Sequence, residues 1–211
     1  MIYTSILISL SITLYLIGFI PYVYHVFHGR VIPHPFSWTI WALFALTNGY
    51  FLIESGWSLF TSIPVFIRAF CLLIGAILGW ISISKIAIGR LDILALLLAI
   101  LLIIFLKIIG IDQAIMCIIL IDFLVLTPTL KKLWFKPQSE DPFAWIMAGV
   151  SQISILASIE HYTFATIGYF AYLAGVNLLV AFIIYRRSFY LSNWRHALRN
   201  FSTNFAFKNK L

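Results

Sequence analysis

Two ionisable side chains lie inside long apolar stretches of this chain, and they are the residues best suited to polar chemistry. Asp122 lies in the apolar run 113–130 and Arg68 in the run 58–83. A charge in hydrocarbon costs at least about 2.5–3.5 kcal/mol, so such residues usually face a cavity or a partner. We predict that Asp122 and Arg68 either pair with each other or meet a polar ligand. The alternatives are a pair that only fixes helix packing, or an Arg68 whose long stem reaches the nearer surface.

Neutral polar and aromatic residues extend this candidate ligand site. For each amide the alternative is a plain interhelical hydrogen bond, worth about 0.6 kcal/mol. Trp41 lies one turn deeper than Trp38 on the same predicted helix face, so its ring can stack on a flat ligand. Trp38 itself and Trp145 are predicted headgroup anchors, because Trp favours the membrane boundary. Besides Asp122 and Arg68, the predicted substrate-binding residues are Trp41, Asn48, Gln152 and Asn177.

The sequence offers little for catalysis or metal binding. His25, His28 and His34 crowd one loop, and three imidazoles are a donor set for Zn²⁺. No carboxylate or cysteine accompanies them there, so we interpret them as an interfacial histidine cluster. Cys71 and Cys117 lie in apolar runs, where a thiol behaves as a small hydrophobe. Because no H-E-x-x-H motif or Gly-rich phosphate loop occurs, we predict no enzyme activity, no metal and no cofactor.

The elements that must position these residues are membrane-spanning helices. Hydrophobic residues make up 63% of the 211 residues and charged residues 10%, with a mean hydropathy of +1.03. Soluble domains carry roughly 25% charged residues. Because hydrocarbon offers the backbone no partner but its own helical ladder, continuous apolar runs predict helices. Seven are expected, at 3–24, 37–53, 58–83, 91–110, 113–130, 144–160 and 163–185.

An internal repeat organises the seven predicted helices. Pro35-Phe36-Ser37-Trp38 recurs 107 residues later as Pro142-Phe143-Ala144-Trp145, and the same shift carries Pro21 onto Pro128. Helices one to three thus correspond to five to seven, and Asn177 to Phe70. Helix four has no counterpart and is expected to be a lipid-facing linker. An odd connecting span makes the halves parallel, as in repeats related by an axis along the membrane normal.

These features resemble the PQ-loop superfamily, which includes SWEET sugar transporters, nicotinamide riboside transporters and the KDEL receptor. The resemblance rests on a proline near the inner end of the first helix of each half, then a basic loop, then Pro-Phe-x-Trp. It spans nearly the whole chain. The family's Pro-Gln dipeptide stands here as Pro21-Tyr22 and Pro128-Thr129. In SWEET transporters an asparagine contacts the substrate, and Asn177 resembles that residue.

The resemblance implies alternating access, in which two three-helix units rock against each other with prolines as hinges. A helix-interior proline removes a hydrogen bond and makes a bend less costly there. Pro21, Pro128 and Pro64 are therefore candidate hinges, with a static kink as the alternative for each. The fold class predicted is an all-α membrane protein with seven transmembrane helices in two parallel repeats. Its parts are repeat 1–84, linker 85–111 with the fourth helix, repeat 112–187 and a basic tail 188–211.

The basic residues predict orientation, because loops rich in Lys and Arg stay cytoplasmic. Twelve of the 14 Lys and Arg residues fall on one side if the N-terminus is outside and the C-terminus is cytoplasmic. The formal charge of +7 is thus a topology signal that favours lipid headgroups, not nucleic acid, as partner. The tail beyond Arg187 has apolar residues at helical spacing and predicts an amphipathic helix on the cytoplasmic leaflet, with docking to a partner as alternative. The expected location is a bacterial inner (plasma) membrane.

The function that these patterns favour is transport of a small polar metabolite, such as a sugar, a nucleoside or vitamin, or an amino acid. Asp122 is the expected proton or substrate site. The alternative is a non-transporting receptor or scaffold of the same fold that binds a peptide or protein partner. Seven spans suffice for a monomeric pore and are equally compatible with a homo-oligomer.

Overall fold

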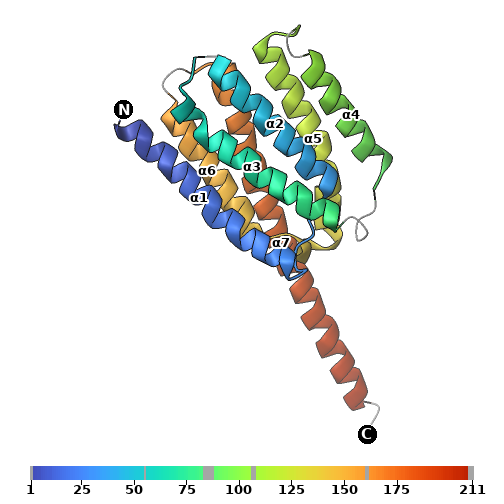
Figure 1. Ribbon diagram of the computed structural model, residues 1–211. Helices are drawn as coiled ribbons and strands as arrows, with labels where there is room; N and C mark the ends of the chain where they lie inside the picture. Colours follow the sequence, from blue (N-terminus) through green and yellow to red (C-terminus); the bar gives the residue numbers. More distant parts are fainter. Residues whose placement is uncertain (1, 55, 83–87, 106–107, 160–161, 209–211) are drawn as a thin grey trace.

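The described residues form a bundle of seven α-helices that run alternately up and down (Figure 1). The computed structural model describes the backbone of residues 2–54, 56–82, 88–105, 108–159 and 162–208, and side chains as far as Phe189 with the exception of Ala165. No strand occurs in these ranges. The helices are α1 Ile2–Phe27, α2 Pro35–Glu54, α3 Leu59–Ile81, α4 Arg90–Phe105, α5 Ile111–Phe135, α6 Pro142–Ser158 and α7 Phe164–Lys208.

Length and composition make this an integral membrane protein, as predicted. Five helices of the described chain are long and apolar enough to cross a membrane: α1, α2, α3, α5 and the part of α7 from Thr166 to Phe189. The apolar α6 has 17 residues and α4 has 16, so these two are shorter than the roughly 20 residues that an untilted span needs. Large apolar side chains, such as Ile20, Phe70 and Leu120, are exposed on the outside of the bundle, where lipid can cover them.

Helix boundaries follow from local sequence. Gly29 and Gly56 adopt positive φ angles of 67° and 87° in the turns after α1 and α2, a conformation that glycine adopts without strain. The Ser58 hydroxyl accepts a hydrogen bond from the Thr61 amide and caps α3. Asp141 caps α6 in the same way through the Phe143 amide, and Pro142 takes the first helical position, where its missing N–H costs nothing.

The helices on either side of α4 pack in corresponding ways. Helix α3 contacts both α1 and α2, while α7 contacts both α5 and α6. Between these two triplets α1 packs along α6, and α2 contacts α5. Figure 1 shows α1 and α6 side by side. Helix α4 packs on α5 and α2 at the bundle surface and buries only Asp92, Ala95, Ala99 and Leu102 of its residues.

Small residues allow two close contacts that shape the interior. A Cβ built on Gly18 of α1 would lie 2.6 Å from the Met147 Cβ of α6, so only glycine permits this approach of the two helices. A Cβ on Gly75 of α3 would overlap the indole ring of Trp38 in α2. These glycines thus let α1 lie against α6 and Trp38 against α3.

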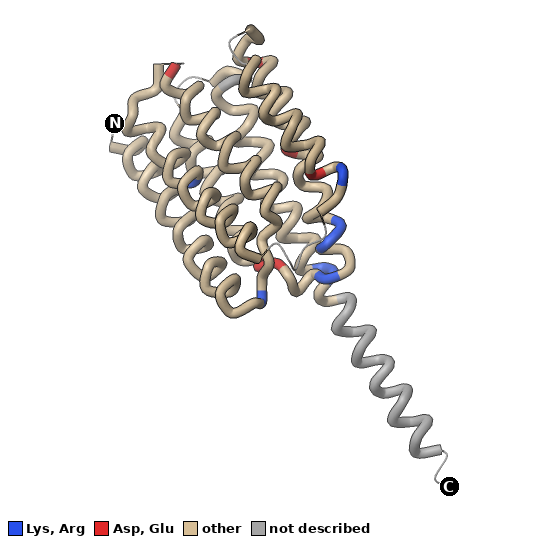
Figure 2. Tube along the Cα trace, turned by 45° about the vertical axis from the view of Figure 1, so that its right-hand side comes forward, with Lys and Arg blue, Asp and Glu red and all other residues tan. Residues whose placement is uncertain are grey.

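Basic residues gather at one end of the bundle, which we call the basic end (Figure 2). It is the end that holds the α1–α2, α3–α4 and α5–α6 connections. Helix α7 continues to Lys208 without a break at the expected boundary between residues 187 and 188. The side chains that would make the amphipathic face of the tail lie outside the described residues. The described basic residues of this end are Arg30, Arg90, Lys131, Lys132, Lys136, Arg186 and Arg187.

Candidate functional site

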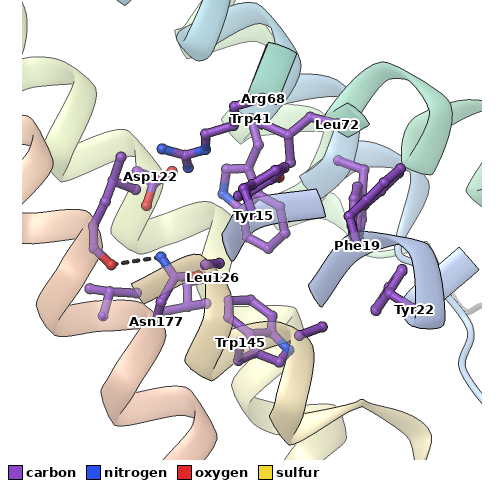
Figure 3. Close-up of a pocket in the computed structure, with 15 residues that line it drawn as sticks. Tyr15, Phe19, Tyr22, Trp41, Arg68, Leu72, Asp122, Leu126, Trp145 and Asn177 are labelled. Atoms are coloured by element: carbon purple, nitrogen blue, oxygen red, sulfur yellow. Dashed lines mark hydrogen bonds between the residues drawn. The ribbon is translucent and has the colours of Figure 1, made fainter. Parts of the chain in front are cut away.

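A cavity of about 70 Å³ lies between the helices, with walls from every helix except α4. A water molecule needs roughly 10–15 Å³ of such space, so the cavity has room for about five waters or a small solute. Figure 3 shows side chains from both sides of α4 converging on it. Its lining residues are Tyr15, Phe19, Tyr22, Trp38, Trp41, Arg68, Leu72, Asp122, Leu126, Ala144, Trp145, Ala148, Leu173, Val176 and Asn177.

Asp122 is the carboxylate of this cavity, and only 2% of its surface is exposed. The Tyr172 hydroxyl donates a hydrogen bond of 2.8 Å to its Oδ2 atom. The Oδ1 atom is buried and has no hydrogen-bond partner in the described structure. A buried polar atom left unpaired costs about 1–3 kcal/mol, and more when it is charged. The Trp41 indole is a further polar neighbour of this carboxylate. Because no hydrogen bond to Oδ1 is formed at normal distance, this oxygen is the one available to a ligand.

Arg68 of α3 supplies the positive charge of the cavity. Figure 3 shows its guanidinium directed toward Asp122 from the opposite wall. Within the described residues no carboxylate lies within 4.0 Å of it, so the two charges share the cavity without a direct ion pair. The hydroxyl of Tyr15, on α1, is its polar neighbour. The structure thus brings Asp122 and Arg68 into one cavity.

Aromatic rings form the wall between the charges and the basic end. The Trp41 ring centroid lies 6.0 Å from that of Trp38 and 5.9 Å from that of Trp145, both edge to face. Tyr22 stacks obliquely on Trp38 at 5.0 Å. Trp41 lines the cavity, as the site prediction expects. Trp38 is only 8% exposed and also lines the cavity, as does the half-buried Trp145, so the prediction that these two are headgroup anchors is wrong.

The three predicted amides are all buried but lie at different places. Asn177 lines the cavity, and its Nδ2 donates a 2.6 Å hydrogen bond to the Leu173 carbonyl one turn earlier in α7. Asn48 and Gln152 are 2% and 1% exposed and are not part of the lining. Because the Asn48 Nδ2 and the Gln152 Oε1 are buried without a partner, both retain unused hydrogen-bonding capacity outside the cavity.

Polar contacts of His25 and Lys132 link the two triplets at the basic end. The His25 Nδ1 atom of α1 lies 2.7 Å from the Asp141 Oδ2 atom that precedes α6. Lys132 of α5 donates a 2.9 Å hydrogen bond to the Ile32 carbonyl and forms an ion pair with Glu140. Glu140 in turn accepts a 3.3 Å hydrogen bond from the Trp145 indole. The cavity wall is therefore tied directly to these cross-contacts.

Sequence reasoning missed Glu140 and Asp141. The available signal was their position, since two carboxylates directly before the second Pro-Phe-x-Trp segment stand in an otherwise basic region. Glu140 is 5% exposed and Asp141 is 8% exposed, so both are buried and paired, whereas loop carboxylates are usually solvated.

The three histidines of the first loop point to different partners. His25 contacts Asp141, and the exposed His28 places its Nδ1 atom 2.8 Å from the Tyr24 carbonyl oxygen. His34 lies 3.7 Å from Asp92 of α4. No group of three metal-ligating side chains occurs among the described residues. His25 and His34 therefore contact other segments, whereas His28 makes a local contact one turn back in the chain.

His34 is held mainly in its neutral form. Burial is the largest effect and lowers its pKa from the usual 6.5, and the charge of Lys132 acts in the same direction. The neighbouring Asp92 carboxylate raises the pKa and only partly offsets the burial. The distance of 3.7 Å agrees with a weak contact, because it is too long for a hydrogen bond.

All three predicted hinge prolines lie inside helices. Pro21 is in α1, Pro64 in α3 and Pro128 in α5. Pro21 and Pro128 lie about two turns before the basic ends of their helices, close to the level of the cross-contacts. Pro21 and Pro128 each remove one backbone hydrogen bond from their helix. A change in the helix bend at either proline would move the contacts between the triplets at the basic end.

Positions that line the cavity recur at fixed spacing. In the first two helices of each triplet, matching lining positions are 107 residues apart, which is the spacing of the Pro-Phe-x-Trp repeat. In the third helices they are 105 residues apart, and α3 and α7 also start 105 residues apart. Phe70, which the 107 shift pairs with Asn177, is 65% exposed; a shift of 105 pairs Asn177 with Leu72 instead. The recurring pairs are Tyr15 and Asp122, Phe19 and Leu126, Trp38 and Trp145, Trp41 and Ala148, Arg68 and Leu173, Leu72 and Asn177.

The function must be argued from this site. Comparison of the chain with protein-family models, with curated proteins and with solved structures found no match.

Proposed function

We propose that the protein carries a small polar solute across the membrane through the cavity between its two helix triplets. The observation that carries the proposal is Asp122, a buried carboxylate with one oxygen bonded to Tyr172 and the other unpartnered at a cavity wall. Intramembrane ionisable residues generally mark substrate or ion pathways. A purely structural carboxylate would be expected to have both oxygens satisfied.

The proposal includes a two-repeat architecture like that of the PQ-loop superfamily. The matching contacts of α3 and α7 within their triplets support it, as do the cavity positions that recur at 107 and 105 residues. Parallel repeats commonly enclose a binding site between them near the bilayer midplane. Helix α4 lines no part of the cavity, which fits a linker that only restores the direction of insertion.

Alternating access then requires closures that open in turn. At the basic end the cross-contacts of His25 with Asp141 and of Lys132 with the Ile32 carbonyl hold the triplets together. Toward the other end, an apolar cluster that includes Leu52, Ile155 and Phe170 packs α2, α6 and α7 against one another. Breaking one closure while keeping the other would expose the cavity to one side at a time, with Pro21 and Pro128 as bending points.

Binding and release fit this lining better than bond-making chemistry. The described lining residues include no histidine, serine or cysteine that Asp122 could activate as a nucleophile or base. We also propose that the basic end faces the cytoplasm and that the N-terminus is outside, because short basic loops are retained on the cytoplasmic side.

Efflux from proteoliposomes tests the transport proposal. Vesicles are loaded with an equimolar mixture of sugars, nucleosides, amino acids and organic ions, and their remaining content is followed by mass spectrometry. We expect protein-dependent loss of at least one compound. Asp122→Asn should slow it by at least about tenfold, because a hydrogen bond to a charged group is worth about 1.5–3 kcal/mol.

Asp112→Asn is the matched control, since Asp112 lies in the exposed first turn of the same helix. It should keep the wild-type rate. If no compound leaves faster than from protein-free vesicles, the transport proposal is wrong and a receptor or scaffold role becomes the better account.

A further inference from the structure

We propose that the cavity selects small zwitterions, molecules that carry both an ammonium and a carboxylate group on an apolar body, such as amino acids with uncharged side chains. This inference rests on the proposed transport function, because it concerns the same cavity. It starts from the two opposite charges that the lining contains, Arg68 on α3 and Asp122 on α5.

The charges lie on different walls and are not neutralised by direct contact. No ion pair within 4.0 Å joins Arg68 to a carboxylate in the described structure, and the Asp122 Oδ1 atom has no hydrogen-bond partner there. Figure 3 shows the guanidinium directed toward the carboxylate from a different helix. A ligand with its own two charges can satisfy both groups at once, with the ammonium toward Asp122 and the carboxylate toward Arg68.

Other charge classes fit this arrangement less well. A cation would be attracted by Asp122 but repelled by the Arg68 guanidinium. An anion would be attracted by Arg68 but repelled by Asp122. An uncharged sugar would remove water from two charges without supplying a counter-charge, which is costly in a low-dielectric site. Charge-assisted hydrogen bonds are roughly twice as strong as neutral ones, so a zwitterion gains most from these two groups.

The rest of the lining favours a small apolar body. Phe19, Trp41, Leu126 and Val176 give the cavity aromatic and apolar walls, and the volume is about 70 Å³. Aromatic faces also attract an ammonium group through cation–π contacts. The Asn177 side chain and the Tyr22 hydroxyl, which is buried without a hydrogen-bond partner, add neutral polar groups to the lining.

The two halves divide the recognition between them. At the position equivalent to Asp122 the first triplet has Tyr15, and at the position equivalent to Arg68 the second has Leu173. Each triplet thus contributes one charge only. A zwitterion would bridge the triplets, so its binding would couple their movements in a way that a ligand held by one triplet would not.

Thermal-shift measurements on the purified full chain test the ligand class, because a ligand that binds only the folded state raises the melting temperature. The probes are matched sets: leucine, leucinamide, 4-methylpentanoate and 4-methylpentanamide, the corresponding sets for valine, alanine and phenylalanine, glycine betaine, and glucose and uridine as uncharged solutes. We expect one or more zwitterions to raise the melting temperature, and their amides, deaminated acids and uncharged analogues to require at least about tenfold higher concentration for the same shift.

Charge-altering variants separate recognition from mere stability. Arg68→Gln should favour the ammonium-only analogue over the carboxylate-only one, and Asp122→Asn should reverse that preference. Arg68→Lys and Asp122→Glu, which keep the charges, should keep the preference for the zwitterion. A structural role alone would weaken all ligands equally and leave the order unchanged.

The outcomes distinguish this inference from the transport proposal. Stabilisation by glucose, uridine or a singly charged analogue in preference to every zwitterion, or by no probe at all, overturns the zwitterion inference. The transport proposal stands in that case if the efflux experiment finds protein-dependent flux. Stabilisation by a zwitterion without any flux supports the ligand class and contradicts transport.

Discussion

At the scale of single residues, the chemistry of this protein is concentrated in charges that the fold removes from water. Asp122 and Arg68 face the cavity, while at the basic end Asp141 contacts His25 of the other triplet and Glu140 binds Lys132 within its own triplet. Their partners differ in kind. The residues at the basic end are satisfied by His25, Lys132 and backbone groups, whereas Asp122 keeps one oxygen without a partner. Of these four residues, the two in the cavity are therefore the ones left for a ligand.

His34 gives a testable pH dependence. Its folded-state pKa is lowered by burial, so below about pH 6.5 the unfolded chain binds a proton that the folded protein still excludes. The contribution of neutral His34 to the free energy of unfolding is therefore fully present above pH 6.5, the pKa in the unfolded chain. It is lost as the pH falls from 6.5 toward the lower pKa of the folded protein. We expect the melting temperature to fall between pH 7.5 and 5.5, and to fall less in His34→Gln.

His28→Gln is the control, because His28 is exposed and lies on the same loop. It should keep the wild-type pH dependence. Asp92 and Lys132, the charged groups that face His34, are present in both variants. Equal slopes in wild type and His34→Gln would contradict this account.

The sequence predicted some of these residues and not others for a physical reason. A charge inside an apolar run is conspicuous, so Asp122 and Arg68 could be selected without a structure. An amide is less informative, since Asn48 and Gln152 are as buried as Asn177 yet lie outside the cavity lining. Whether an amide points into the cavity depends on how its helix is rotated about its own axis. A helix that is apolar on all sides has no polar face from which this rotation could be predicted.

At the scale of helices, the cavity depends on how closely glycine allows neighbours to approach. Gly18→Ala places a methyl group against Met147 and the α6 backbone, where the built Cβ lies 2.6 Å from the Met147 Cβ. We expect destabilisation of about 1–3 kcal/mol, the usual cost of overpacking. A lower melting temperature of the detergent-solubilised variant would report it.

Gly175→Ala on α7 is the matched comparison, because nothing lies within 4 Å of its added Cβ. It should leave stability unchanged or raise it by about 0.5–1 kcal/mol, since alanine favours the helix over glycine. The interpretation of a tight α1–α6 contact would be wrong if both variants changed the melting temperature alike.

Gly75→Ala tests the link between helix packing and the cavity. The added methyl group overlaps the Trp38 ring, so the ring must move and the aromatic wall must change. We expect solute efflux to slow severalfold while the protein remains folded. Tryptophan fluorescence should shift in parallel, and an unchanged efflux rate would show that the Trp38 wall is unimportant.

The helices themselves were largely predictable, but their ends and packing were not. Continuous apolar runs identified all seven, because the membrane leaves the backbone no alternative to a helical ladder. The repeat was visible in Pro-Phe-x-Trp, yet a uniform shift of 107 paired Asn177 with the exposed Phe70. The third helices start 105 residues apart, because α6 is three residues shorter than α2 while the connection before α7 is one residue longer than that before α3. Such small differences in length do not follow from hydropathy.

At the scale of the whole molecule, the gathering of basic residues at one end predicts orientation. Gln138 and Tyr162 lie exposed at opposite ends. In a background with Cys71 and Cys117 replaced by alanine, we expect a membrane-impermeant maleimide to label Tyr162→Cys on intact cells. Gln138→Cys should react only after permeabilisation, and the reverse pattern would invert the proposed topology.

The central claim is that solute passes through the cavity between the two triplets, and chemical block of that cavity tests it most directly. Ala148 lines the cavity from α6, so Ala148→Cys in the same cysteine-free background places a thiol in the proposed path. Modification by a charged methanethiosulfonate reagent, verified by intact mass, should stop efflux from proteoliposomes, while the same treatment of Gln138→Cys leaves the rate unchanged. Full efflux after complete modification of Ala148→Cys would contradict the claim.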